Sequence, residues 1–143
     1  MNRKKRLLGI DVGLKRVGIA QSDLSGILAS PLGTFSMSEA LATLARMCLE
    51  GEVCQIVVGL PLTLRGKEGD ASKMVRSFIR EMEKVTGEVP VTLLDERFTS
   101  TLAQQSIRDS GARQKKRRQK GLIDSTAATI LLQDYLDRQN MHR

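Results

Sequence analysis

The fold is decided by residues 6–22, which read RLLGIDV, then GLK, then RVGIAQS. The first seven residues form a short apolar run that is typical of a buried strand, and the last seven alternate between apolar and polar positions. The three residues between them, Gly13-Leu14-Lys15, have the length and composition of a tight turn. The segment therefore predicts two antiparallel strands near the start of the chain.

The remainder of the chain alternates between strand patterns and helix patterns. Residues 27–35 predict a third strand, and Pro31 within it favours a position at the edge of a sheet. Ser36 and Glu39 have the spacing of a capping box at the start of a helix. Further strands are predicted at residues 53–59 and 89–94, and helices at 36–51, 70–87, 99–110 and 122–136. The order βββαβαβαα predicts an α/β domain, with a mixed sheet and helices on both faces.

The composition places this chain among soluble globular proteins and excludes several kinds of chemistry. Of its 143 residues, 41% are hydrophobic and 27% charged. The first apolar run stops at Asp11, too early for a secretory signal, so we expect a cytoplasmic protein without a membrane partner. Cys48 and Cys54 form no C-x-x-C pair and are expected to be reduced apolar side chains. The single histidine, His142, argues against a Ser-His-Asp site or an imidazole-based zinc site.

The positive charge of the chain is concentrated in two clusters. Lys and Arg total 23 against 16 Asp and Glu, a net charge of +7. The clusters are Arg3, Lys4, Lys5 and Arg6, followed by Arg113, Lys115, Lys116, Arg117, Arg118 and Lys120. Such a local excess indicates a polyanionic partner, although a solvated tail explains the N-terminal cluster equally well. With 3% aromatic residues and no Trp, phosphate contacts rather than base stacking would dominate that binding.

Acidic residues occur at the expected ends of two strands and at the start of a helix. Asp11 interrupts the first strand, Asp95 and Glu96 end the last strand, and Asp124 falls in the first turn of the final helix. Each acid also has a local explanation: it could form a hydrogen bond within a turn, or it could lie at the start of a helix, where the helix dipole favours negative charge. Alternation allows only one of Asp95 and Glu96 to share a site with Asp11. Three carboxylates together would require a cation, and oxygen ligands favour Mg²⁺ or Mn²⁺, which can hydrolyse phosphodiesters without histidine.

Four motifs occur in order over residues 7–137. They are Leu8-Gly9-Ile10-Asp11-Val12-Gly13-x₄-Gly18-Ile19-Ala20, Val58-Gly59-Leu60-Pro61-Leu62, Asp95-Glu96-Arg97-Phe98-Thr99-Ser100 and Ile123-Asp124-Ser125-x-Ala127-Ala128. This ordered set resembles the YqgF/RuvX nuclease family. The resemblance implies a ribonuclease H-like fold, akin to that of Holliday junction resolvases. It also implies a role as a nuclease that trims precursor 16S ribosomal RNA.

The resemblance further implies a catalytic and metal-binding site made of Asp11, Glu96 and Asp124, with Glu96 rather than Asp95 pointing inward. The chain departs from the pattern at two places. Arg65 stands before Gly66, where relatives usually carry a polar or acidic residue. Gly59-Leu60-Pro61 stands where resolvases of this fold tend to place an acid at the end of the strand beside the first.

Basic residues near the acids and in the second cluster are candidates for binding nucleic acid. Lys15, Arg16 and Arg97 lie close to the acids in sequence and are candidates to hold phosphate, with ordinary surface charge as the alternative. The basic cluster of residues 113–120 is expected to grip the backbone without reading sequence. We thus expect a single domain over residues 1–143, with a basic N-terminal segment (1–6) and a basic loop (111–120).

The sequence leaves several functions open. The first is a metal-dependent nuclease that processes the 5′ end of precursor 16S rRNA. The second is a Holliday junction resolvase, which would need a two-fold dimer to cut opposed strands of four-way DNA. The third is an RNA-binding module without catalysis. A fourth, an actin-like ATPase, fits the Asp-x-Gly-x₄-Gly pattern, but those enzymes bind nucleotide between two domains.

Overall fold

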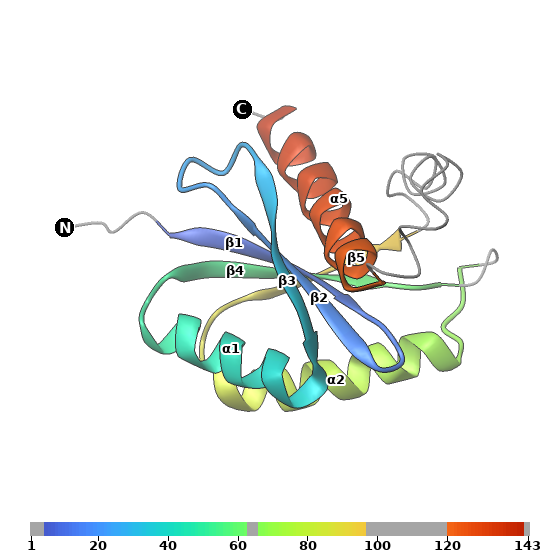
Figure 1. Cartoon of the computed structure of the whole chain (residues 1–143). Coiled ribbons are helices and arrows are strands. Elements are labelled where there is room, and N and C mark those ends of the chain that lie inside the picture. The colour runs from blue at the N-terminus through green and yellow to red at the C-terminus, as the bar shows by residue number, and fades with distance from the viewer. Residues whose placement is uncertain (1–4, 63–65, 97–119, 142–143) are drawn as a thin grey trace.

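The computed structural model describes residues 5–62, 66–96 and 120–141, with side chains in the last helix described from residue 127 onward. One five-stranded sheet has the order β3-β2-β1-β4-β5 (Figure 1). Its strands are β1 (Arg6–Val12), β2 (Arg16–Ser22), β3 (Ala29–Ser36), β4 (Val53–Leu60) and β5 (Val91–Asp95). The described helices are α1 (Met37–Leu49), α2 (Asp70–Thr86) and α5 (Lys120–Met141).

The first two strands form the predicted hairpin. They pair antiparallel, with Asp11 opposite Gly18, and the Gly13 amide donates a hydrogen bond of 2.8 Å to the carbonyl of Arg16. Strand β3 pairs with β2 and lies at the edge of the sheet, as the proline at position 31 predicted. The predicted capping box is also present, since Ser36 and Glu39 each bond the other's backbone amide.

Strands β1, β4 and β5 run parallel to one another. Ile10 pairs with Val58 of β4, and Val58 pairs in turn with Leu93 of β5. The carboxyl ends of these three strands therefore meet along one side of the sheet, beyond Val12, Leu60 and Asp95. We call this side the carboxyl edge, and the opposite side, where the same strands begin, the amino edge.

The two faces of the sheet carry different helices. Helices α1 and α2 cover one face, and α5 crosses the other (Figure 1). The α1/α2 face contains the larger core, whose members include Ile10 and Val58. The smaller core on the α5 face contains Ala20, Val57, Ala128, Leu132 and Leu136. Mixed-sheet architecture with helices on both faces was predicted from the order of elements, and it is confirmed.

Helix α5 packs directly on β1 and begins near the carboxyl edge. A side chain at Gly9 would meet Leu132 Cβ at 2.7 Å and the Ala128 carbonyl at 3.0 Å, so the helix backbone needs that glycine. At the other end of the helix, Asn140 Nδ2 donates to the Gly26 carbonyl, which lies in the β2–β3 connection at the amino edge. The start of α5 must therefore lie toward the carboxyl edge.

Two helix and strand boundaries differ from their predicted positions, and one predicted helix lies outside the described residues. Helix α5 begins at Lys120 rather than at residue 122, so Asp124 is its fifth residue and the prediction that it lies in the first turn is wrong. Strand β5 begins at Val91, after Pro90, rather than at residue 89. The helix predicted at residues 99–110 lies outside the described residues, as does most of the basic loop 111–120.

The described helices include none that is both long and apolar enough to cross a membrane. Cys48 is half-buried and Cys54 is exposed, and no disulfide joins them.

Candidate active site at the carboxyl edge

Asp11 lies near the end of β1 on the α5 face of the sheet. Its neighbours Ile10 and Val12 point into the α1/α2 core, so alternation along the strand turns Asp11 to the opposite face. The carboxylate is half-buried. The strand patterning therefore places an acid where a buried apolar residue would otherwise contact α5.

Glu96 follows β5 directly and reaches toward β1 from the other side of β4. Gly59 of β4 pairs with Leu94 of β5 and lies between the two acids. A Cβ atom built on Gly59 would overlap the Glu96 carboxylate and would stand 3.1 Å from both Cγ and Cδ of that side chain. The Glu96 side chain therefore lies over Gly59, and it forms a hydrogen bond with the side chain of Asp11.

The electrostatics of this pair differ from those of exposed acids. Burial, the negative charge of Asp11, the hydrogen bond to Asp11 and the charge of Asp95 together raise the pKa of Glu96 to about 8. At neutral pH, the pair of Asp11 and Glu96 thus shares a proton in this hydrogen bond. When the shared proton leaves, both carboxyl groups carry negative charge, and a bound cation can then stabilise the pair.

The third predicted acid, Asp124, belongs to α5, and its side chain lies outside the described side chains. It comes four residues, or about one helical turn, before Ala128, which packs over Gly9. Because α5 begins toward the carboxyl edge, its backbone approaches the side of the sheet that carries Asp11. Among the described side chains, no three His, Cys, Asp or Glu residues gather closely enough to hold one metal ion.

The basic candidates are divided between the two edges. Lys15 and Arg16 are exposed in the hairpin that follows β1, at the carboxyl edge. Lys5 and Arg6 lie at the amino edge, where Arg6 Nη1 donates to the Ser22 carbonyl at 2.9 Å. Lys120 begins α5, and only its backbone is described. Arg65, Arg97, Arg113, Lys115, Lys116, Arg117 and Arg118 lie outside the described residues.

Sequence reasoning missed the part that Gly59 plays at this edge. The motif containing it was interpreted as a place where an expected acid is absent. A signal was nevertheless available, because a nearly all-apolar strand carries a glycine near its end and two other strands carry acids near theirs. Recognising it requires the register of β1, β4 and β5, which fixes the residue that separates Asp11 from Glu96.

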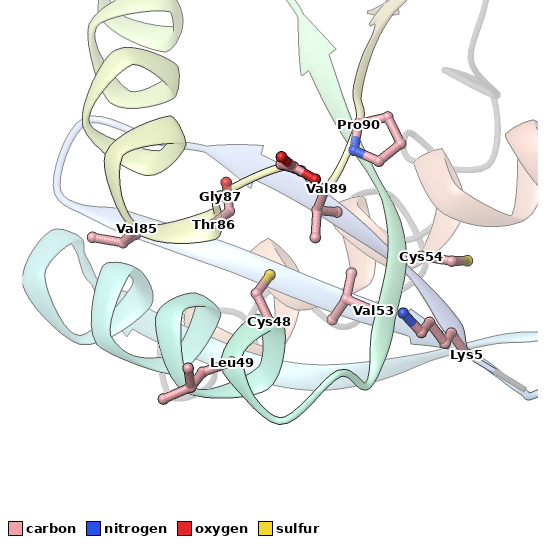
Figure 2. Close-up of a pocket in the computed structure, with 11 residues that line it drawn as sticks. Lys5, Cys48, Leu49, Val53, Cys54, Val85, Thr86, Gly87, Val89 and Pro90 are labelled. Atoms are coloured by element: carbon pink, nitrogen blue, oxygen red, sulfur yellow. The ribbon is translucent and has the colours of Figure 1, made fainter. Parts of the chain in front are cut away.

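A hollow of about 590 Å³ lies at the amino edge, far along the strands from the paired acids (Figure 2). Its walls come from the ends of α1 and α2 and from the starts of β4 and β5, including Cys48, Thr86 and Pro90. Glu88 is the one acid among its described lining residues. Since the hollow offers a single acid and the carboxyl edge offers a pair, the carboxyl edge is the better candidate for the active site.

The fold class follows from the sheet order together with its likeness to a solved structure. The structure of T. thermophilus RuvC in complex with Holliday junction substrate matches with a TM-score of 0.55 and 14% identity, covering 95% of this chain and 96% of that one. The chain thus has the ribonuclease H-like fold of RuvC. A family model described as "RuvX: Holliday junction resolvase" matches residues 5–138.

The chain belongs to this RuvX family. A relative from Mycobacteroides abscessus is 43% identical over 138 residues, covering 94% of this chain and 82% of its own. Another, from Salinibacter ruber, is 38% identical and covers 96% of both chains. Each of these relatives is provisionally named a pre-16S rRNA nuclease. The predicted membership in the YqgF/RuvX family is confirmed.

Proposed function

We propose that this chain is a divalent-metal-dependent nuclease that hydrolyses phosphodiester bonds near the 5′ end of precursor 16S rRNA. The observation that carries the proposal is the hydrogen-bonded pair of Asp11 and Glu96 at the carboxyl edge of a ribonuclease H-like sheet. Membership in the RuvX family supports nuclease activity, and the names of the relatives support the RNA substrate.

The residues present fit Mg²⁺ or Mn²⁺ as the cofactor. Asp11 and Glu96 supply oxygen donors only, and ionising both at this separation is unfavourable unless a cation lies between them. Asp124 is proposed as the third ligand, brought from the start of α5. When bound, such an ion would activate water and neutralise charge at the scissile phosphate.

Residues of the chain are proposed to control metal binding and to hold the substrate. Glu96 must release its proton before it can act as a ligand, so we expect metal affinity to rise with pH until the pH passes about 8. Lys15 and Arg16, exposed beside Asp11, are proposed to hold the phosphate backbone, together with Arg97. The basic residues between 113 and 120 would add contacts to the backbone that do not depend on sequence.

A second substrate is favoured by the description of the family model, which names Holliday junction resolvases. Resolution of a four-way DNA junction needs two active sites related by two-fold symmetry. This candidate therefore predicts a dimer in solution and symmetric cuts in opposed strands.

The test is cleavage of a precursor 16S rRNA fragment and of a four-way DNA junction, each with Mn²⁺. Wild type is compared with Asp11→Asn and with the control Asp70→Asn, which makes the same change in charge on an exposed residue of α2. We expect Asp11→Asn to slow RNA cleavage about a hundredfold or more and Asp70→Asn to leave it unchanged.

Each alternative outcome is informative. Equal cleavage by wild type and Asp11→Asn would contradict the assignment of the active site. Preferential cutting of the junction by a dimer would favour the resolvase function. RNA binding by wild type without any cleavage would indicate a binding module.

A further inference from the structure

We infer that Gly59 is a positioning residue, whose missing side chain leaves the gap through which Glu96 reaches Asp11 across β4. The inference rests on the proposed function, because the pair that Gly59 permits is the proposed metal site. It extends that function to a residue that has no side chain with which to bind metal or substrate.

The sheet order makes such a gap necessary. Strand β4 lies between β1 and β5, so the strands that carry Asp11 and Glu96 are two strand spacings apart, or about 10 Å. Ile10 pairs with Val58, which places Asp11 level with Gly59, and Gly59 itself pairs with Leu94. A carboxyl group from β5 can meet Asp11 only by crossing over β4 at this level.

The contacts show what a side chain at position 59 would do. A Cβ atom there would overlap the Glu96 carboxylate and crowd its Cγ and Cδ atoms at 3.1 Å. The clashing atoms belong to one flexible side chain, which can rotate away without moving backbone. Alanine at position 59 would therefore displace Glu96 from Asp11 while leaving the sheet intact.

Backbone conformation does not explain the glycine. Gly59 is absent from the glycines with positive φ, namely Gly26, Gly33, Gly51, Gly66 and Gly87. It lies in a regular buried strand, where alanine is tolerated by the backbone and favoured by entropy. The requirement for glycine is therefore the space that Glu96 occupies.

Gly9 provides a matched control on the neighbouring strand and the same face. A Cβ atom at Gly9 would meet Leu132 Cβ at 2.7 Å and the Ala128 carbonyl oxygen at 3.0 Å. These atoms belong to the packed core of α5, so Gly9→Ala must shift the helix. The two substitutions are chemically identical, but one acts on packing and the other on the acid pair.

The experiment measures Mn²⁺ affinity by calorimetry, RNA cleavage rate and melting temperature for wild type, Gly59→Ala, Gly9→Ala, Glu96→Gln and the double variant Gly59→Ala/Glu96→Gln. We expect Gly59→Ala to melt close to wild type, yet to lose about tenfold or more in Mn²⁺ affinity and in cleavage rate. In the Glu96→Gln background, the same substitution should add no further loss. Gly9→Ala should lower the melting temperature, because it displaces a packed helix, whereas Gly59→Ala should not.

Two results would overturn the inference while the proposed function stands. One is wild-type Mn²⁺ affinity and cleavage in Gly59→Ala. The other is an equal loss from Gly59→Ala whether or not Glu96 is present, because that would show an effect independent of the carboxylate. A wild-type chain that neither binds Mn²⁺ nor cuts RNA would instead contradict the proposed function, and the role of Gly59 would fall with it.

Discussion

The two faces of the same parallel strands have been put to different uses. On the α1/α2 face, β1 and β4 remain apolar to their carboxyl ends, with Val12 and Leu60 buried in the core. On the α5 face, the same strands change near those ends to Asp11 and Gly59. Core packing on the α1/α2 face thus holds the strands in register. The α5 face can therefore carry a pair of carboxyl groups where apolar side chains would otherwise pack. Because side chains alternate between faces along a strand, the residues that stabilise the fold and the candidate catalytic residues lie on opposite faces of the sheet.

The largest expected effect on stability comes from the α1/α2 face. Ile10 is fully buried in the larger core. We expect Ile10→Ala to lower the free energy of unfolding by about 2–5 kcal/mol, measured by urea denaturation. Asp11→Asn, one residue along the chain on the other face, should change stability far less. The comparison fails if Ile10→Ala is as stable as wild type, or if Asp11→Asn loses stability to the same extent.

A substitution on the α5 face, at Glu96, is expected to raise the free energy of unfolding, by less than Ile10→Ala lowers it. Because the pKa of Glu96 is raised to about 8 in the folded chain, the folded state holds a proton that the unfolded state releases above about pH 4.5. Without metal, this difference lowers the free energy of unfolding as pH rises from about 4.5 to 8. Glu96→Gln should therefore be more stable than wild type at pH 8, by at most a few kcal/mol, and the gain should shrink toward pH 5.

Urea denaturation in the presence of a chelator, at pH 5 and pH 8, measures this difference. Glu83→Gln, on the exposed side of α2, is the matched control, and it should stay within about 0.5 kcal/mol of wild type at both values. A gain from Glu96→Gln that is the same at both pH values would show that burial and the neighbouring charges do not raise the pKa of Glu96 in the folded chain.

Most of the sheet could be predicted from the sequence because burial imposes a visible period on each strand. The hairpin of residues 6–22, the edge strand containing Pro31 and the capping box at Ser36 all depend on neighbours close in sequence. The length of α5 could not be predicted in this way. Asn140 donates a hydrogen bond to the Gly26 carbonyl, so a polar contact to the β2–β3 connection lies beyond the apolar pattern that ends at residue 136.

The candidate site was predictable only in part. The interruption of an apolar strand by Asp11 singled out that residue, and the family resemblance indicated Glu96 in preference to Asp95. Their meeting depends on the register of three parallel strands and on the absence of a side chain at Gly59, neither of which is a local property of the sequence. The prediction that Asp124 lies in the first turn is wrong because α5 begins at Lys120, two residues before the apolar pattern starts.

The most direct test of the central claim is the anomalous diffraction of a crystal of the wild-type chain soaked in Mn²⁺. We expect a manganese peak at the carboxyl groups of Asp11 and Glu96, with the hydrogen bond between the two groups broken. A manganese peak elsewhere, or none at millimolar Mn²⁺ with Asp11 and Glu96 still hydrogen-bonded, would contradict it.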